Sequence, residues 1–448
     1  MLYFILRVLF TTGLRVFFRQ LKVSNRSAIP GQGPLLVASN HPNTFMDPIV
    51  IASLLRQQCY FIAKSTVFNS PFKKWLLRQM NLIPIHRRED LPDQPFSNEE
   101  AFMASFKALE EGKTLMIFPE GNSFNERRLR KIKTGTARIA LGAEAQHNYS
   151  LGVKILPVGL NYSAPTRFRS DVLVNIGEPI RVADFAAAYQ QDAQAAADHL
   201  TDRLREQLES LIVNTPTEEE DQLLRHIETV YKDRLVAEVP AGAPEHEQEF
   251  QLSKAIIKSI NYFNREQPQR VAAFRQKIHN YVLQLKRLRL QDAVLGKRHG
   301  QLLSQSIIAS IYLLLGFPLY LYGVVQNYIP YIIPSKIADY LTEEEEWRAP
   351  VMMTVGIFVF PLFYLLLGLL FWQLLPEPYY LVLYLLSLPL SGFFALHYWN
   401  TFRHTHGHWT LLSLFFKRSS LVNQLRQQRR EILQELEQGK QEYLSKNS

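Results

Sequence analysis

A histidine and an aspartate follow one apolar run and together could act as a general base. The run Leu35–Ser39 leads into a loop that carries His41 and, six positions later, Asp47. A neutral imidazole can take a proton from an attacking hydroxyl, and a nearby carboxylate fixes its tautomer and stabilises the imidazolium, which contributes roughly 10²–10⁴ in rate. The same residue types also occur without catalysis, because Asn40 and Asn43 could cap turns, Asp47 could cap the start of a helix, and His41 could be an ordinary loop histidine.

A second apolar run, Thr114–Phe118, leads into a Pro-Glu-Gly turn and a basic tract. Gly121 lets backbone approach a ligand closely. The cations of the tract could neutralise phosphates, although a solvated basic loop is the alternative; they are Arg127, Arg128, Arg130, Lys131 and Lys133. A third run, Leu82–His86, ends at Arg87. Three strands that end in such residues predict a ligand crevice at the carboxyl edge of an α/β sheet.

These segments resemble the glycerolipid acyltransferase superfamily, whose members acylate glycerol 3-phosphate, 1-acylglycerol 3-phosphate and dihydroxyacetone phosphate. Four sequence blocks match in order over about residues 30–182. They are NHPNTFMD (40–47), IPIHR (83–87), FPEGNS (118–123) and ILPVGLNY (155–162). The resemblance implies an α/β fold with a mixed sheet flanked by helices, to which this chain adds a helical subdomain and C-terminal transmembrane helices.

The resemblance also implies roles for individual residues. His41 would be the base, and Asp47 would orient it. Arg87 and the turn at Glu120 and Gly121 would bind the glycerol phosphate. The other expected substrate-binding residues are Asn43, Asn122, Ser123, Arg127, Arg130 and Lys133.

Two departures from the family pattern bear on these assignments. The commonest pattern has four residues between the histidine and the aspartate, whereas 42–46 makes five here, as in the branch of yeast-type dual glycerol-phosphate/dihydroxyacetone-phosphate acyltransferases. One extra helical residue turns Asp47 by about 100°, so a bulged loop must absorb the rotation. The usual Glu-Gly-Thr-Arg-Ser reads Glu-Gly-Asn-Ser-Phe and lacks its arginine. We therefore expect the phosphate contact to come from Arg127, Arg128, Arg130 or Lys133.

Composition divides the chain into five predicted segments. Residues 1–29 have apolar positions at helical spacing interrupted by arginines, which predicts an interfacial amphipathic helix; a surface helix that covers the core is the alternative. Residues 30–182 alternate short apolar runs with helical stretches and form the acyltransferase domain. Residues 183–300 have no strand signal and predict a helical subdomain, and 401–448 a basic helical tail. Residues 301–400 form the transmembrane region.

The transmembrane prediction rests on three runs without an ionisable group, each about as long as a hydrocarbon core is thick. They are Ile307–Val325, Val351–Trp372 and Tyr379–Leu396. Basic residues precede the first run and follow the last, and both clusters favour the cytoplasm. Three full crossings cannot place both there, so we expect one run to be a re-entrant hairpin broken at 316–318. The predicted location is a multi-pass membrane protein whose catalytic domain lies on the cytoplasmic face.

The composition also indicates which class of partner the protein binds. The net charge of +9 favours an anionic partner, and membrane lipids suit it better than nucleic acid, because the basic residues are dispersed and no nucleic-acid motif interleaves them.

Cys59 is the only cysteine, which excludes an intrachain disulfide and a multi-cysteine zinc site. We interpret it as a buried filler, with a thiol nucleophile as the alternative. No metal is predicted, although metal binding is the alternative for a cluster of His397, His404, His406 and His408.

The sequence thus predicts an enzyme that moves a fatty acyl group to a hydroxyl of glycerol 3-phosphate or 1-acylglycerol 3-phosphate in phospholipid synthesis. The donor would be acyl-CoA or acyl-carrier protein, and no other cofactor is expected. The alternative is a catalytically inactive lipid-binding membrane protein of the same fold. A His41–Asp47 separation too wide for a hydrogen bond would favour that alternative.

Overall fold

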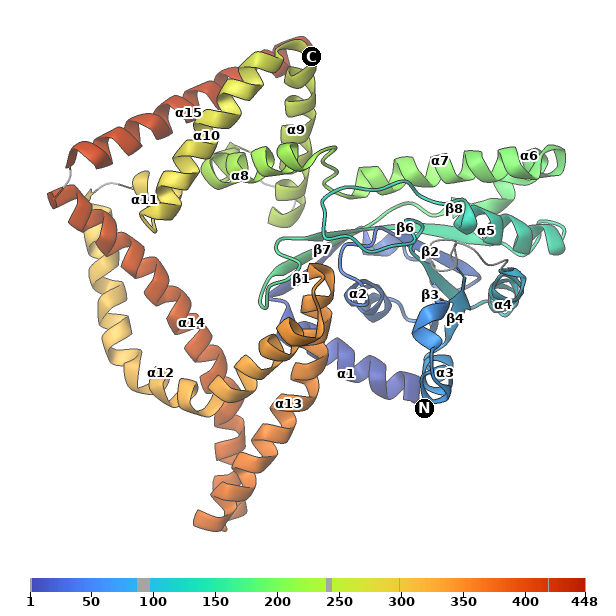
Figure 1. Cartoon of the computed structure of the whole chain (residues 1–448), viewed down its shortest axis with the longest axis horizontal. Coiled ribbons are helices and arrows are strands. Elements are labelled where there is room, and N and C mark those ends of the chain that lie inside the picture. The colour runs from blue at the N-terminus through green and yellow to red at the C-terminus, as the bar shows by residue number, and fades with distance from the viewer. Residues whose placement is uncertain (1, 87–96, 239–243, 298, 418, 448) are drawn as a thin grey trace. The chain divides into compact units, whose positions relative to one another are not determined.

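Apolar runs in the first half of the chain pair into one mixed β-sheet in the computed structural model (Figure 1). Its strands are β1 (Gln20–Ser24), β2 (Leu35–Ser39), β3 (Cys59–Lys64), β4 (Leu82–Ile85), β5 (Thr114–Ile117), β6 (Lys154–Tyr162), β7 (Asp171–Ile176) and β8 (Ile180–Arg181). The order is β1-β7-β6-β2-β5-β3-β4, and β8 also pairs with β6. Neighbours run parallel except where β6 meets β7 and β8. The carboxyl ends of β2, β5, β3 and β4 therefore follow one another along one edge.

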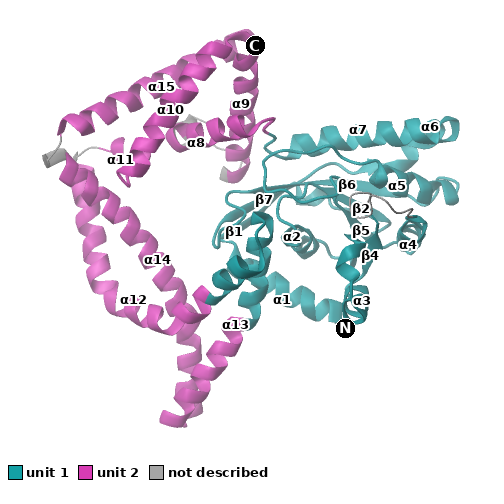
Figure 2. Cartoon of the chain, in the orientation of Figure 1, with its two compact units in different colours: residues 1–214, 333–358 teal, residues 215–332, 359–448 magenta. Residues whose placement is uncertain are grey.

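The structure describes residues 2–86, 97–238, 244–297, 299–417 and 419–447. Its contacts divide the chain into two compact units (Figure 2). The first unit combines Met1–Asn214 with Ile333–Phe358, and the second combines Thr215–Ile332 with Val359–Ser448. The first unit thus takes in a short segment far along the chain, which composition does not reveal.

Helices cover both faces of the sheet in the first unit. The helices of its N-terminal segment are α1 (Leu2–Phe17), α2 (Met46–Leu54), α3 (Pro71–Gln79), α4 (Glu99–Glu110), α5 (Gly135–Gln146), α6 (Ala186–Gln191) and α7 (Ala193–Leu211). One core cluster joins the sheet to α4, α5 and α7. The other joins the opposite face to α1, α2 and the first turns of α13 (Glu345–Leu374). Burial on both faces explains why strands such as β2, buried at all five positions, read as continuous apolar runs.

The three strands predicted above, Leu35–Ser39, Leu82–His86 and Thr114–Phe118, are all present, with bounds that differ by one residue or none. Strand β1 was not predicted, because Gln20–Ser24 directly follows an apolar helix and is nowhere fully buried. Helix α1 itself buries Leu14 and Phe17 in the core while Phe4, Ile5 and Val8 stay exposed. Both the core-covering and the interfacial interpretations of this helix thus find support in different residues of it.

The second unit is entirely helical in its described residues. Its shorter helices are α8 (Glu218–Glu238), α9 (Glu245–Glu266), α10 (Pro268–Arg287), α11 (Asp292–Leu295) and α15 (Ser419–Asn447). A buried polar group joins three of these helices: Asp292 accepts hydrogen bonds from Tyr281 (2.6 Å) and from Arg429 (2.9 Å). The seam of the packed helices includes Phe274, Ile278 and Leu285 of α10.

Among the described residues, three helices are long and apolar enough to cross a membrane. They are α12 (His299–Leu341), α13 and α14 (Pro378–Lys417). Helix α12 continues through 316–318 without interruption, so the break predicted there is wrong. The candidate spans are Gly300–Leu341, Glu345–Leu374 and Pro378–Leu414, each longer than the runs identified from the sequence.

Candidate active site

His41 lies in the loop between β2 and α2, and its imidazole reaches Asp47. Nδ1 of His41 is 2.8 Å from Oδ2 of Asp47. Helix α2 begins at Met46, so Asp47 lies in its first turn. Just before it, Thr44 adopts a φ of 36°, which is uncommon for a residue with a side chain and bends the loop. The loop, not the helix, therefore absorbs the extra residue between the two side chains.

Asp47 is fully buried, and three groups donate hydrogen bonds to it or share one with it. Oδ2 meets the imidazole and also accepts from the backbone N–H of Asn43 (2.8 Å). Oδ1 accepts from the hydroxyl of Tyr162 (2.7 Å). Burial and the neighbouring carboxylate raise the pKa of Tyr162 well above its usual value, so this hydroxyl stays a donor. Hydrogen bonds of this kind stabilise the ionised carboxylate. Tyr162 ends the block ILPVGLNY, yet the sequence analysis gave it no role.

The other imidazole nitrogen, Nε2, is positioned to act as the base. With Nδ1–H donated to Asp47, Nε2 carries the lone pair. No residue in the described parts of the chain forms a hydrogen bond with Nε2, and the side chain is 18% exposed. The ring stacks on Phe118 at a centroid distance of 4.0 Å, which fixes its plane. An incoming hydroxyl could therefore reach Nε2 without displacing a protein group.

Glu120 joins the turn after β5 to the catalytic loop. One carboxylate oxygen accepts from the backbone N–H of His41 (2.9 Å), and the other accepts from that of Arg130 (3.0 Å). Burial raises the pKa of Glu120, and these two N–H groups act against that rise. Since both oxygens are engaged and an anionic phosphate would be repelled, the geometry supports a positioning role for Glu120.

The Glu-Gly turn is tightly constrained. Gly121 has a φ of +82°, and a Cβ there would lie 2.9 Å from Nζ of Lys133. Its N–H donates to the carbonyl of Phe118 (3.0 Å). Beyond the turn, the Ser123 hydroxyl accepts from the N–H of Thr44 (2.8 Å). The turn after β5 and the loop after β2 thus hold each other.

The basic tract lies on this turn, but its charges are partly engaged. Arg130 pairs with Glu126 at 2.7 Å, and its guanidinium carbon lies 3.3 Å from the centre of the Phe124 ring. Arg128 also approaches Glu126, at 3.3 Å. Lys133 lies against Gly121, in the turn that Glu120 and Ser123 join to the catalytic loop. Its ammonium group is therefore a candidate for the phosphate contact.

The remaining predicted site residues have different positions. Asn43 is fully buried and donates to the carbonyl of Pro165 (3.1 Å), so its side chain supports the loop. Asn122 is half-buried, next to Ser123. Arg87 lies outside the described residues, and its binding role stays a prediction.

Lys64 is a cation that the sequence analysis missed. It is the last residue of β3 and pairs in register with Ile85 of β4, on the same sheet edge as His41 and Glu120. Because β3 lies between β5 and β4, Lys64 falls between the Glu120 turn and the strand that leads to Arg87. The signal was available, since a lysine ends the apolar run CYFIAK.

Cys59 lies at the start of β3, away from that edge. It is fully buried, and burial raises the pKa of its thiol to about 12. A thiol in this state is a poor nucleophile. The interpretation as a buried filler therefore fits better than the thiol alternative.

Comparison with known proteins identifies the family of this region. Residues 20–161 match the family model described as Acyltransferase. An uncharacterized acyltransferase of Schizosaccharomyces pombe is 23% identical over 362 residues, which cover 62% of this chain and 52% of that protein. Glycerol-3-phosphate O-acyltransferase 1 of Saccharomyces cerevisiae is 26% identical over 240 residues, 52% of this chain and 31% of that protein.

Bacterial proteins match as well. The 1-acyl-sn-glycerol-3-phosphate acyltransferase of Bacillus subtilis is 24% identical over 192 residues, 41% of this chain and 86% of that protein. The crystal structure of the acyltransferase PlsC from Thermotoga maritima aligns over 45% of this chain and 78% of that chain, with 22% identity and a TM-score of 0.33. The match spans about half of the fission-yeast relative and about a third of the budding-yeast one. This chain therefore carries a domain of the acyltransferase family, and that domain contains the His41–Asp47 pair.

Proposed function

We propose that this protein transfers a fatty acyl group from acyl-CoA or acyl-carrier protein to a hydroxyl of glycerol 3-phosphate or 1-acylglycerol 3-phosphate. The observation that carries the proposal is the 2.8 Å hydrogen bond between His41 and a buried Asp47, with Nε2 left open. A separation too wide for a hydrogen bond would have favoured the alternative of an inactive lipid-binding protein. The similarity to glycerol-3-phosphate and 1-acylglycerol-3-phosphate acyltransferases supports the choice of acceptors.

The reaction would proceed by direct transfer. Nε2 of His41 takes the proton of the acceptor hydroxyl as its oxygen attacks the thioester carbonyl. Asp47 stabilises the imidazolium that forms, as a buried carboxylate does in other histidine pairs. When the tetrahedral intermediate collapses, the carbon–sulfur bond breaks, the thiolate takes the proton from His41, and an ester remains. Lys133 and Lys64 supply positive charge for the acceptor phosphate at this edge.

The membrane setting is part of the proposal. The three apolar helices would anchor the enzyme in a membrane that holds the acyl chains, as a multi-pass protein with its catalytic domain on the cytoplasmic face. Its partners would be membrane lipids, the acyl donor (including acyl-carrier protein) and the glycerol phosphate acceptor. No cofactor beyond the donor is required by the mechanism.

The test is an assay of the purified full-length protein with labelled acyl donors. It pairs acyl-CoA and acyl-carrier protein with glycerol 3-phosphate, dihydroxyacetone phosphate and 1-acylglycerol 3-phosphate. We expect ester formation by the natural sequence and none above background by His41→Ala, which should stay folded because His41 is partly exposed. Equal activity of His41→Ala on every acceptor would eliminate His41 as the base, and inactivity of the natural sequence with all pairs would favour the lipid-binding alternative.

A further inference from the structure

The first turn of α13 contacts the catalytic loop within the first unit. The Thr44 hydroxyl donates to the carbonyl of Glu346 (3.0 Å). The ring of Phe45 meets the indole of Trp347 at a centroid distance of 5.7 Å, edge to face. Further along the same helix, Ala349 is buried in the core that also contains Met46. The start of α13 thus touches the loop between His41 and Asp47, although it lies far outside the segment that matches the family model.

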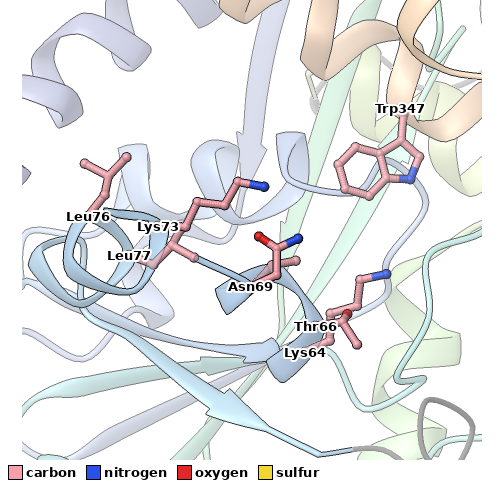
Figure 3. A pocket seen from close by; sticks show the side chains of 8 residues that line it. Lys64, Thr66, Asn69, Lys73, Leu76, Leu77 and Trp347 are labelled. Carbon is pink, nitrogen blue, oxygen red and sulfur yellow. The ribbon is translucent and has the colours of Figure 1, made fainter. Parts of the chain in front are cut away.

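Trp347 also forms one wall of a hollow of about 520 Å³ (Figure 3). Its other lining residues come from β3, α3 and the segment between them: Lys64, Thr66, Val67, Asn69, Lys73, Leu76 and Leu77. Figure 3 shows the ammonium groups of Lys64 and Lys73 on the side toward Trp347, and Leu76 and Leu77 on the far side. The hollow therefore has a cationic side next to the catalytic loop and an apolar side away from it.

From this arrangement we infer that the hollow binds an acceptor that carries its own alkyl chain, a monoacylglycerol phosphate, and that Trp347 is a specificity-determining residue. The inference rests on the proposed function and adds the class of acceptor to it. The phosphate lies at Lys64, which both the hollow and the proposed reaction share, with Lys73 as a further cation, and the chain passes Trp347 toward Leu76 and Leu77. Apolar walls beside charged groups are what such an amphiphile requires.

The spacing of the sheet agrees with this placement. Lys64 ends β3, and one strand, β5, separates β3 from β2, the strand that leads to His41. Strands lie about 4.8 Å apart, so the backbone at Lys64 is roughly 10 Å across the sheet from that of β2. The hydroxyl, phosphate and ester of a monoacylglycerol phosphate are on adjacent carbons, so one molecule reaches both places. Glycerol 3-phosphate would leave the apolar walls exposed to water, which costs free energy.

A substitution at Trp347 tests the inference through the ratio of kcat/KM for the acylated acceptor to kcat/KM for glycerol 3-phosphate. For full-length protein in phospholipid nanodiscs, kcat/KM is measured with 1-palmitoylglycerol 3-phosphate and with glycerol 3-phosphate. We expect the natural sequence to use the acylated acceptor and Trp347→Ala to lower the ratio of the two values by about 10-fold or more, since loss of apolar contact of this size costs 10–200-fold. Trp347→Phe should retain most of the ratio.

Trp75 provides a matched control, because it is an exposed tryptophan of α3 that does not line the hollow. Trp75→Ala should leave the ratio unchanged. An equal loss with both acceptors in Trp347→Ala, or use of glycerol 3-phosphate alone by the natural sequence, overturns the inference while the proposed function stands. Activity with no acceptor would instead remove the proposed function.

Photolabelling tests where the acceptor binds and does not depend on turnover. The probe is a long-chain alkyl phosphate with a diazirine on the chain, and labelled peptides are identified by mass spectrometry. We expect labels on peptides that contain 64–77 or Trp347, reduced in Trp347→Ala and retained in Trp75→Ala. Labels confined to other peptides overturn the inference.

Discussion

The hydroxyl of Tyr162 holds Oδ1 of Asp47, and the N–H of Asn43 holds Oδ2, the oxygen that also meets His41. These contacts mean that the carboxylate has little freedom to rotate, so its hydrogen bond to Nδ1 selects one imidazole tautomer. The motif around His41 was enough to predict the pair. It was not enough to predict the third partner, because Tyr162 lies 115 residues away from Asp47 along the chain and its contact is set by the β2–β6 pairing.

Replacement of Asp47 by Asn should separate the positioning of His41 from the binding of substrate. The amide cannot stabilise the imidazolium and favours the wrong tautomer, so we expect kcat to fall by about 10²–10⁴-fold with a smaller change in KM. Steady-state kinetics with a saturating donor measure both constants. Tyr162→Phe is the milder companion and should lower activity less than Asp47→Asn does; a larger loss in Tyr162→Phe would contradict the assigned roles.

Gly121 is predicted to be intolerant of a side chain for two separable reasons. Its positive φ strains any other residue, and a Cβ would push against Lys133. Gly112 has a φ of +68° but open space around it, so Gly112→Ala contains only the first effect. We expect both substitutions to lose about 1 kcal/mol of stability, and only Gly121→Ala to weaken acceptor affinity as well, because its Cβ displaces the flexible end of Lys133. Thermal unfolding and KM for the acceptor test this, and equal effects of the two substitutions would show that the Lys133 contact is unimportant.

At the scale of elements, the sheet order explains why the predicted site residues meet. Strands β2 and β5 are neighbours, so the loop after one and the turn after the other share hydrogen bonds through Glu120 and Ser123. Strands β2 and β5 could be predicted because strands buried on both faces are continuously apolar. Strand β1 could not, since Gln20–Ser24 is only half-buried and its register with β7 depends on residues about 150 positions later.

Helix α8 gives a prediction about pH. Burial, followed by the nearby His279 and Lys286, lowers the pKa of His226. In the unfolded chain this histidine binds a proton near pH 6.5, whereas the folded helices favour its neutral form. The stability it contributes is therefore complete above about pH 6.5 and decreases as the pH falls below that value. His226→Leu should flatten this dependence in thermal unfolding between pH 7.5 and 5.5, and His279→Leu should weaken it; an unchanged slope in His226→Leu would refute the assignment.

At the scale of the whole molecule, the acyltransferase domain is built from two separate stretches of chain. The first turns of α13 supply Ala349 and Met353 to the core beneath α2. No local pattern in the sequence could predict this, because the same residues read as the start of an apolar membrane run. The candidate membrane helices fall where the sequence predicts a membrane region, but the contribution of α13 to the core of the first unit was not predicted.

Met353→Ala should therefore destabilise the catalytic domain, although Met353 belongs to a candidate membrane helix. The side chain is 3% exposed, and truncation of a buried methionine costs about 2–5 kcal/mol. We expect thermal inactivation of acyl transfer at a temperature lower by at least about 4 °C. Met103→Ala, at a position that is 51% exposed, is the control and should shift it little. Equal shifts would mean that the buried contact contributes nothing.

Because α13 lies late in the sequence, it is synthesised well after the sheet that it helps to cover. A ribosome that has completed Asn214 has made the whole sheet, yet it must still add 215–353 before Met353 can cover the core. At about 5–20 residues per second, this interval lasts roughly 7–30 s. Throughout it, the nascent sheet carries an uncovered apolar patch beside its histidine, which makes a chaperone or the membrane surface a necessary companion of translation.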